Sequence, residues 1–447
     1  ILSGLVGSEM CIRDSASCAS FLKYMSKVLG MAIHRAKKFA KSKAKRLLNA
    51  MPPRIKLILH RILDAVRPQQ KLTTVGSTPV GLGENTDAYG RPFPDPNALT
   101  RLIIGPANHA EQAWHWCRAA EKHIDSVSAI SMSRLRSPLR FRTDYAVEMP
   151  AYRNAKWSET QEAWIDQYFT HVLIDGIRPI LGPRVQDDCL LEVAELKSLG
   201  LNVGLIAHGS EIRIPSMHAD LYPTSPFRNV PAEDKDRVAI MEKNTQVWNK
   251  FFNEFDGPTF VSTVDLLDFA PKATYLPTIV IPEEWQTSKP ISLSPKPTVL
   301  HLPTNGLLKG SHLIDPILQK LDQDGVIKYL RLESVPPTEV PHYIEQADIV
   351  VEQVVLGLYS VMAIQAMAAG RLAIAHIPDR VRARSLDGNV PVLDATGENL
   401  EAVIREVIAN PAQYEALAAQ GPTFVDALHT GKASAEAMRP FLAKKRT

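Results

Sequence analysis

The sequence predicts an α/β protein with two parallel-sheet domains, preceded by a basic helical arm. Short runs of β-branched and other apolar residues alternate with helical patterns through residues 99–285. The same alternation returns through residues 286–430. Strands that alternate with helices form parallel sheets, because each crossover helix returns the chain to the same end of the sheet. We therefore expect two sheets, with ligands bound at the carboxyl ends of their strands.

Composition is that of an ordinary soluble protein, with 45% apolar and 22% charged residues in a chain of 447. No apolar run reaches the roughly 18 residues that a transmembrane helix needs. The four cysteines show no paired spacing, which argues against a zinc site or a disulfide framework. This cysteine usage predicts a reducing, cytoplasmic compartment.

Charge is distributed unevenly along the chain. Residues 21–71 contain 14 Lys and Arg against one acid, Asp64, although the net charge of the whole chain is only +3. The first 15 residues, ILSGLVGSEMCIRDS, resemble a translated sequencing adapter, so we exclude them from fold prediction. A signal peptide is the alternative interpretation of this segment.

Residues 16–67 are predicted to form a basic amphipathic helical arm. Apolar residues recur at helical spacing from Phe21 to Ala40 with lysines between them, and Pro52-Pro53 separate a second short helix. Such helices lie on anionic membrane surfaces, which predicts a peripheral position at the inner face of the cell membrane. A solvated helix and a nucleic-acid-binding arm are the alternatives, and the scarcity of stacking aromatics argues against nucleic acid. A linker rich in Gly, Pro, Asn and Asp follows at residues 68–98.

The first domain has polar residues directly after its predicted strands. Asn108, Asp175 and His208 each follow such a strand, and Glu211 and Arg213 belong to the run that starts at His208. We expect these residues near one edge of the sheet. The predicted strands cover residues 102–104, 127–130, 172–175, 203–207 and 260–263, and the helices cover residues 110–122 and 189–199.

The second domain has two loops that each lead from a strand into a helix. One loop carries Lys309-Gly310, and the other ends at Ser360-Val361. The free N–H groups of a helix N-terminus suit an anion such as a diphosphate. The predicted strands cover residues 298–302, 329–333, 349–351 and 372–375. Helices are expected at residues 311–321, 339–346, 361–369 and 400–428, with a last one at 434–444 in the tail 431–447.

The second domain resembles the donor-binding segment of GT-B retaining glycosyltransferases of the glycogen-synthase-like group 1 type. The resemblance rests on Asp348, Gly357, Tyr359, the run Ala366-Met367-Ala368-Ala369-Gly370 and the buried strand after it. In the first domain, His208-Gly209 resembles a strand that ends in His-Gly in this family. The resemblance extends from Arg101 to Leu428 and implies two Rossmann-like domains, which together form the GT-B fold.

The resemblance implies a nucleotide-sugar donor between the domains, a cell-envelope, lipid-linked or polysaccharide acceptor, retention of configuration, and no cofactor or metal. Lys309 and His208 would be the catalytic residues, with Lys309 on the diphosphate and His208 facing the sugar. The expected donor-binding residues are Asn305, Gly310, Gly357, Tyr359, Ser360, Val361 and Gln365. The expected acceptor-side residues are Asn108, Asp175, Glu211 and Arg213.

The sequence departs from the family pattern at three positions. The family often carries two glutamates eight residues apart, where this chain has Gly357 and Gln365. An arginine of the phosphate-binding segment is also replaced, by Asn305 or Gly306. These departures favour, as an alternative, a non-catalytic GT-B protein that binds a glycan, a nucleotide or a partner. A sugar-nucleotide epimerase of the same fold is less favoured, because its extra carboxylates are not apparent.

Overall fold

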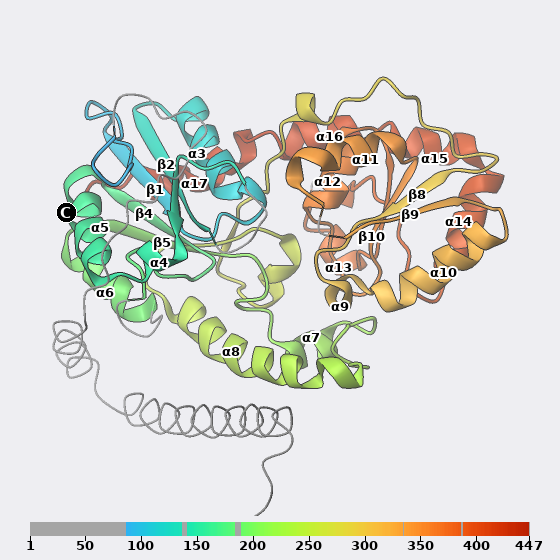
Figure 1. Cartoon of the computed structure of the whole chain (residues 1–447), viewed down its shortest axis with the longest axis horizontal. Coiled ribbons are helices and arrows are strands. Elements are labelled where there is room, and N and C mark those ends of the chain that lie inside the picture. Colours follow the sequence, from blue (N-terminus) through green and yellow to red (C-terminus); the bar gives the residue numbers. More distant parts are fainter. Residues whose placement is uncertain (1–85, 136–140, 184–188, 334, 386–387, 447) are drawn as a thin grey trace, which may run out of the picture. The chain divides into compact units, whose positions relative to one another are not determined.

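The computed structural model describes residues 86–135, 141–183, 189–333, 335–385 and 388–446 (Figure 1). The adapter-like peptide, the predicted basic arm and most of the predicted linker lie outside the described residues. None of the helices among the described residues is long and apolar enough to cross a membrane.

The first sheet has seven strands, all parallel, in the order β3-β2-β1-β4-β5-β6-β7. The strands are β1 Thr100–Gly105, β2 Val127–Leu135, β3 Tyr145–Glu148, β4 His171–Asp175, β5 Asn202–Ala207, β6 Thr259–Val261 and β7 Thr274–Tyr275. The helices of this region are α3 Gln112–His123, α4 Met149–Tyr152, α5 Ala155–Tyr168, α6 Cys189–Ser198, α7 Pro215–Leu221 and α8 Lys235–Glu254.

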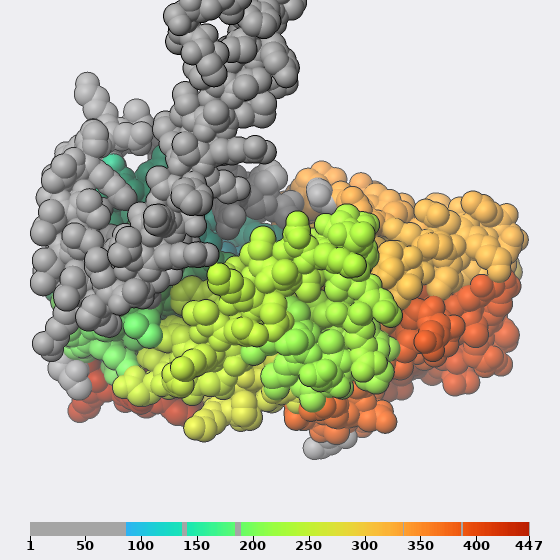
Figure 2. Space-filling view, turned by 90° about the horizontal axis from the view of Figure 1, so that it is seen from below, coloured from blue at the N-terminus to red at the C-terminus, as the bar shows by residue number. Residues whose placement is uncertain are grey.

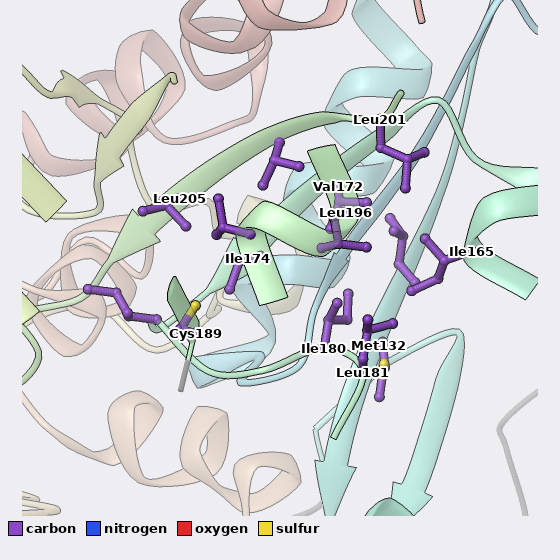
Figure 3. Close-up of a cluster of buried hydrophobic side chains, with 14 of the residues drawn as sticks. Met132, Ile165, Val172, Ile174, Ile180, Leu181, Cys189, Leu196, Leu201 and Leu205 are labelled. Atoms are coloured by element: carbon purple, nitrogen blue, oxygen red, sulfur yellow. The ribbon is translucent and has the colours of Figure 1, made fainter. Parts of the chain in front are cut away.

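A continuous apolar core joins this sheet to the helices on one of its faces (Figure 3). Val172 and Ile174 of β4 pack with Leu205 of β5, Leu196 of α6 and Ile165 of α5. All five side chains are fully buried. Their burial fixes the central strands, and therefore also the loops that leave the carboxyl ends of those strands.

The second sheet has four parallel strands in the order β11-β10-β8-β9. The strands are β8 Thr298–His301, β9 Lys328–Arg331, β10 Ile349–Gln353 and β11 Leu372–Ala375. The helices between and after them are α9 Gly306–Lys309, α10 Ser311–Gln323, α11 Val340–Gln346, α12 Val361–Ala368 and α13 Asp379–Arg382. The two predicted parallel sheets are thus confirmed.

The C-terminal region is helical, as predicted, and residues 400–428 form three helices: α14 Leu400–Ala409, α15 Pro411–Ala418 and α16 Gly421–Leu428. Pro411 and Pro422 lie in the first turns of α15 and α16, where proline is tolerated because no N–H is needed. The last helix, α17 Lys432–Leu442, returns to the first sheet. There Phe441 and Leu442 pack with Leu102.

Helices α7 and α8 were not predicted, and they form much of the surface seen in Figure 2. The segment at α7 also contacts the second domain. His218 Nε2 lies 3.2 Å from the carbonyl oxygen of Leu356, and the hydroxyl of Thr224 lies 3.4 Å from that of Val355. These contacts hold the loop between β10 and α12 against the first domain.

Candidate functional site

A cavity of about 1430 Å³ lies where the carboxyl ends of the two sheets face each other. The first domain contributes His109 and His208 to its lining, from the loops that follow β1 and β5. The second domain contributes Lys309, at the end of α9, Ser360, at the N-cap of α12, and Gln365, in the middle of α12. The site thus lies where ligands bind in open parallel sheets.

The loop after β1 has an unusual backbone. Asn108, Ala110 and Glu111 have φ values of 49°, 49° and 64°, a left-handed region that non-glycine residues rarely adopt. The predicted start of a helix at residue 110 is therefore a 3₁₀ turn, His109–Glu111, ahead of α3. The N–H of Asn108 donates to Asp175 Oδ2 over 2.5 Å, which secures this conformation. Such strain is common at functional sites.

His208 has both ring nitrogens occupied by protein partners. Its Nε2 lies 2.5 Å from Asp175 Oδ1, and its Nδ1 lies 3.0 Å from the hydroxyl of Ser262. Trp116 stacks parallel to the imidazole, with ring centroids 5.8 Å apart. His208 lines the cavity, as expected, but in this arrangement neither nitrogen is available to a ligand.

Asp175 and His208 form an ion pair. Burial alone would lower the pKa of His208, but the adjacent Asp175 carboxylate outweighs it and raises this pKa. Burial alone would raise the pKa of Asp175, but His208 and the N–H of Asn108 lower it. The shifts have the directions of a stabilised imidazolium–carboxylate pair.

His109 differs from His208 in its exposure, its hydrogen bonding and the direction of its pKa shift. Its side chain is exposed to the cavity, and within the described part of the chain neither ring nitrogen makes a hydrogen bond. Its ring meets that of His208 edge to face, with centroids 5.0 Å apart. Loss of bulk solvent and the positive charge of His208 lower the pKa of His109. It therefore presents a neutral imidazole with both nitrogens free.

The four expected acceptor-side residues do not line the cavity. They lie near His109 and His208 and support the loops that carry these two histidines. Asn108 and Asp175 brace the loop after β1, and Glu211 accepts a hydrogen bond from the N–H of His208 over 3.1 Å. Arg213 donates to the buried carboxylate of Asp265 over 2.5 Å. Their part in binding an acceptor remains a prediction.

Gly209 is required by the packing of this region. Its φ is 132°, and a Cβ atom there would lie 2.4 Å from a guanidinium nitrogen of Arg213. A side chain would thus be both strained and obstructed. The His-Gly pair that carried the resemblance in the first domain therefore has a local structural reason for its glycine.

In the second domain, Lys309 is paired with Glu352, the fourth residue of β10. Lys309 Nζ lies 2.7 Å from Glu352 Oε1 and 3.2 Å from the hydroxyl of Ser360. The other carboxylate oxygen of Glu352 accepts from the N–H of Ser360 over 3.0 Å, and the Ser360 hydroxyl also contacts Glu352. The side chain of Lys309 is 16% exposed and that of Glu352 only 1%.

The start of α12 offers further hydrogen-bond donors to the cavity. Val361, Met362 and Gln365 line it together with Ser360. The N–H groups of Val361 and Met362 donate no hydrogen bond within the described residues, as expected for the first turn of a helix. Lys309, expected as a catalytic residue, and three of the expected donor-binding residues (Ser360, Val361 and Gln365) therefore come together, and their roles remain predictions.

The other expected donor-side residues do not line the cavity. Asn305 caps α9, and Gly310 ends it with a φ of 72°. Tyr359 is buried, and its hydroxyl lies 2.9 Å from that of Ser385. These three residues shape the loops that position Lys309 and α12.

Gly357 occupies the position at which the family in the sequence resemblance often carries its first glutamate. Its φ is 77°, and a Cβ atom there would lie 2.9 Å from the ring of Tyr222, which belongs to the first domain. Because Tyr222 is itself almost fully buried, it has little room to move. An acidic side chain at this position does not fit the present contact between the domains.

Three residues at the cavity or next to its lining, Arg142, His109 and Glu352, were not identified as site residues from the sequence. Arg142 binds Glu111 and, through two hydrogen bonds of 2.6 and 3.0 Å, Glu284, which lies where the chain crosses between the domains. Its guanidinium lies over the ring of Trp114, 4.7 Å from the centroid.

His109 follows the first predicted strand of its domain, and Glu352 follows the predicted strand at residues 349–351. Polar residues at the carboxyl ends of strands are candidates for a site, so this position was the signal in the sequence that could have identified both residues.

Comparison with solved structures supports this architecture. The chain is similar to sucrose-phosphate synthase from Thermosynechococcus elongatus, with 12% identity over 76% of this chain and 97% of that one, and a TM-score of 0.50. It is also similar to Anabaena HepE in complex with UDP and glucose, with 10% identity, coverage of 76% and 99%, and a TM-score of 0.51. The chain has the GT-B fold.

A third similar structure is an α-glucosyltransferase in complex with UDP and a DNA 13-mer, with 9% identity, coverage of 77% and 99%, and a TM-score of 0.50. No protein-family model and no curated protein matches the sequence of the chain. At these identities, the similarity of the GT-B chain to the solved structures concerns its fold. The fold class implied by the sequence resemblance is thereby confirmed.

Proposed function

We propose that this GT-B protein is a glycosyltransferase that moves a sugar from a nucleotide-sugar donor to a glycan or lipid-linked acceptor, with retention. The observation that carries the proposal is the meeting of Lys309 and the free N–H groups of α12 at the cavity. A leaving nucleoside diphosphate gains negative charge, and a fixed cation with helix N–H groups stabilises that charge. UDP is present in the structures of HepE and the α-glucosyltransferase, which supports this donor class.

In this proposal, the second domain binds the nucleoside diphosphate and the first domain contacts the sugar. Lys309 and the N–H groups of Val361 and Met362 bind the diphosphate, and Gln365 hydrogen-bonds a ribose hydroxyl. His109, whose ring nitrogens are free, contacts a sugar hydroxyl, while the Asp175–His208 pair holds the wall against which His109 lies. His208 thus becomes a positioning residue instead of the catalytic histidine that the resemblance implies.

The experiment is a screen of nucleotide-sugar hydrolysis and nucleotide binding with the full chain. We expect release of a nucleoside diphosphate from at least one of the UDP-, GDP- or ADP-sugars, at a rate that an added acceptor increases. Binding without turnover would instead support the non-catalytic alternative. Glu352 is the residue that favours that alternative, because it neutralises Lys309. Absence of both binding and turnover would contradict the proposal.

We further propose that the arm, residues 16–67, binds an anionic membrane surface and brings the enzyme to its acceptor. The proposal rests on the excess of lysine and arginine in an amphipathic pattern. Deletion of residues 16–72 should abolish sedimentation with anionic vesicles, and the binding of the full chain should weaken as salt rises. Neutral vesicles and a DNA duplex are the controls. Equal sedimentation of the truncated protein, or preference for the duplex, would contradict this role.

A further inference from the structure

Glu352 occupies the place where an anion would bind at the start of α12. Its carboxylate accepts from the N–H and contacts the hydroxyl of Ser360, and it lies 2.7 Å from Lys309 Nζ. Each of these groups is a natural partner for a phosphate. The protein therefore supplies its own carboxylate to part of the proposed diphosphate site.

The charge balance of this half of the cavity is unusual. Among the described residues of the second domain that line the cavity, Lys309 alone is charged. Glu352 cancels that charge from behind, because its side chain is buried and the side chain of Lys309 remains partly exposed. A diphosphate that approaches Lys309 thus meets a neutral pair instead of a free cation, and it meets the negative charge of Glu352 at short range.

We propose that Glu352 competes with the donor diphosphate for Lys309 and thereby sets a low affinity for the nucleoside diphosphate product. This inference rests on the proposed function. When the diphosphate binds, Lys309 turns from Glu352 toward it, and the N–H groups of Val361 and Met362 complete the site. When the product leaves, Lys309 returns to Glu352, so the carboxylate favours product release.

The competing interpretation is purely structural. Glu352 would then be an internal cap of α12 that also holds Lys309 in place. The two interpretations predict opposite signs for a Glu352→Gln variant. The amide oxygen of glutamine can still accept from Ser360, but the charge on Lys309 is no longer cancelled. Competition predicts tighter binding of a diphosphate, whereas a structural role predicts unchanged or weaker binding.

The test is calorimetric titration of UDP, GDP and uridine into the full chain. For Glu352→Gln we expect the affinity for a nucleoside diphosphate to rise about tenfold, the scale of one favourable charge contact. The affinity for uridine, which has no phosphate, should change less than about twofold. Asp315→Asn is the matched control. It removes a carboxylate that pairs with Arg331 over 2.9 Å, and neither residue lines the cavity.

Unchanged or weaker diphosphate binding by a folded Glu352→Gln variant would overturn the inference, and so would equal tightening of uridine. If this variant does not fold, Glu352→Asp serves instead. Its shorter carboxylate withdraws from Lys309, so diphosphate binding should tighten by a smaller factor, and unchanged binding would again overturn competition. Failure of the wild-type protein to bind any nucleoside diphosphate would overturn the proposed function itself, which the wild-type titration reports separately.

Discussion

Each domain has one ion pair with a member that lines the cavity, and the two pairs differ in what a ligand can reach. In the first domain, Asp175 is fully buried, and both nitrogens of His208 are bound by protein atoms. In the second domain, the Lys309 ammonium pairs with Glu352, but its side chain remains partly exposed at the cavity. The first pair can therefore only stabilise the position of nearby loops, whereas in the second pair Lys309 can exchange Glu352 for a ligand.

The difference separates stability from binding. A buried ion pair with every polar atom satisfied is costly to break, because the remaining charge has no partner. In the second pair, the buried Glu352 carboxylate keeps its contacts to the N–H and hydroxyl of Ser360 when the partly exposed Lys309 turns to a ligand, so partner exchange costs less. We expect changes at the Asp175–His208 pair to affect mainly the unfolding free energy, and changes at Lys309 and its neighbours to affect mainly ligand binding and turnover.

The largest effect is expected for Asp175→Asn. The amide places a donor or an uncharged acceptor where His208 and the N–H of Asn108 both need a carboxylate. The unfolding free energy from urea denaturation should fall by about 3 kcal/mol or more, as for the removal of one member of a buried pair. Asp256→Asn, which removes an exposed partner of Lys197, should change it by less than about 1 kcal/mol.

The same variant has a defined pH dependence. The raised pKa of His208 contributes stability that is complete below pH 6.5 and is lost as the pH rises through the folded-state value. The lowered pKa of Asp175 contributes stability that is complete above pH 3.8 and is lost as the pH falls. The difference between wild type and variant should thus be largest between these pH values and should shrink in alkaline solution. A difference that does not vary with pH would contradict an ion pair.

The next largest effect is expected for Lys309→Ala. Loss of the cation that faces the leaving diphosphate should lower turnover by about a hundredfold or more. Lys328→Ala, at an exposed position of β9, is the control and should leave turnover unchanged. The double variant Lys309→Ala with Glu352→Gln removes the unpaired carboxylate as well. If turnover recovers in the double variant, the defect comes from Glu352 and not from loss of the cation.

The parts of the fold that the sequence predicted best are strands whose consecutive residues are buried. Strands β8, β10 and β11 of the second sheet are almost entirely buried, whereas β9 is only partly buried and contains Lys328 and Arg331. The structure places each of the four strands within two residues of its expected bounds. Helix α8 was missed for the opposite reason. Only Thr245 and Phe252 of its 20 residues are buried, so the sequence has no wide apolar stripe.

The site was predicted only in part, because residue type and position do not determine partners. Lys309 and Ser360 were expected from a loop and a helix start, and both line the cavity. The pairing of Lys309 with Glu352 depends on how α9 lies against the end of β10, which no local pattern encodes. Likewise, the sequence contains His109 and His208 at similar positions after strands, and only the tertiary structure shows which imidazole has free nitrogens.

A smaller effect is expected for Gln365→Glu, which adds a negative charge to the second-domain side of the cavity, where Lys309 also lies. A carboxylate makes a stronger hydrogen bond to a ribose hydroxyl than an amide does. Donor affinity should therefore stay equal or improve by up to about 1 to 2 kcal/mol. Titration with UDP and GDP measures the change, and Gln413→Glu, at an exposed position of α15, is the control. A clear loss of affinity would show that Gln365 does not face the ribose.

The smallest effect is expected for His109→Asn, and it tests the contrast between the two histidines directly. His109 has free nitrogens at the cavity, so its loss should lower turnover by about tenfold, near the value of one hydrogen bond. The unfolding free energy and the affinity for UDP should stay close to wild type, because His109 makes no hydrogen bond to the described part of the chain and the proposal gives it no phosphate contact.

The same substitution at the neighbouring histidine should have the reverse outcome. His208→Asn breaks the contacts to Asp175 and Ser262, so it should lower the unfolding free energy well beyond what His109→Asn does. Because the protein lowers the pKa of His109, its imidazole stays neutral below pH 6.5, and wild-type turnover should persist there. If His109→Asn destabilised the fold as much as His208→Asn, or left turnover unchanged, His109 would not be the histidine that contacts substrate.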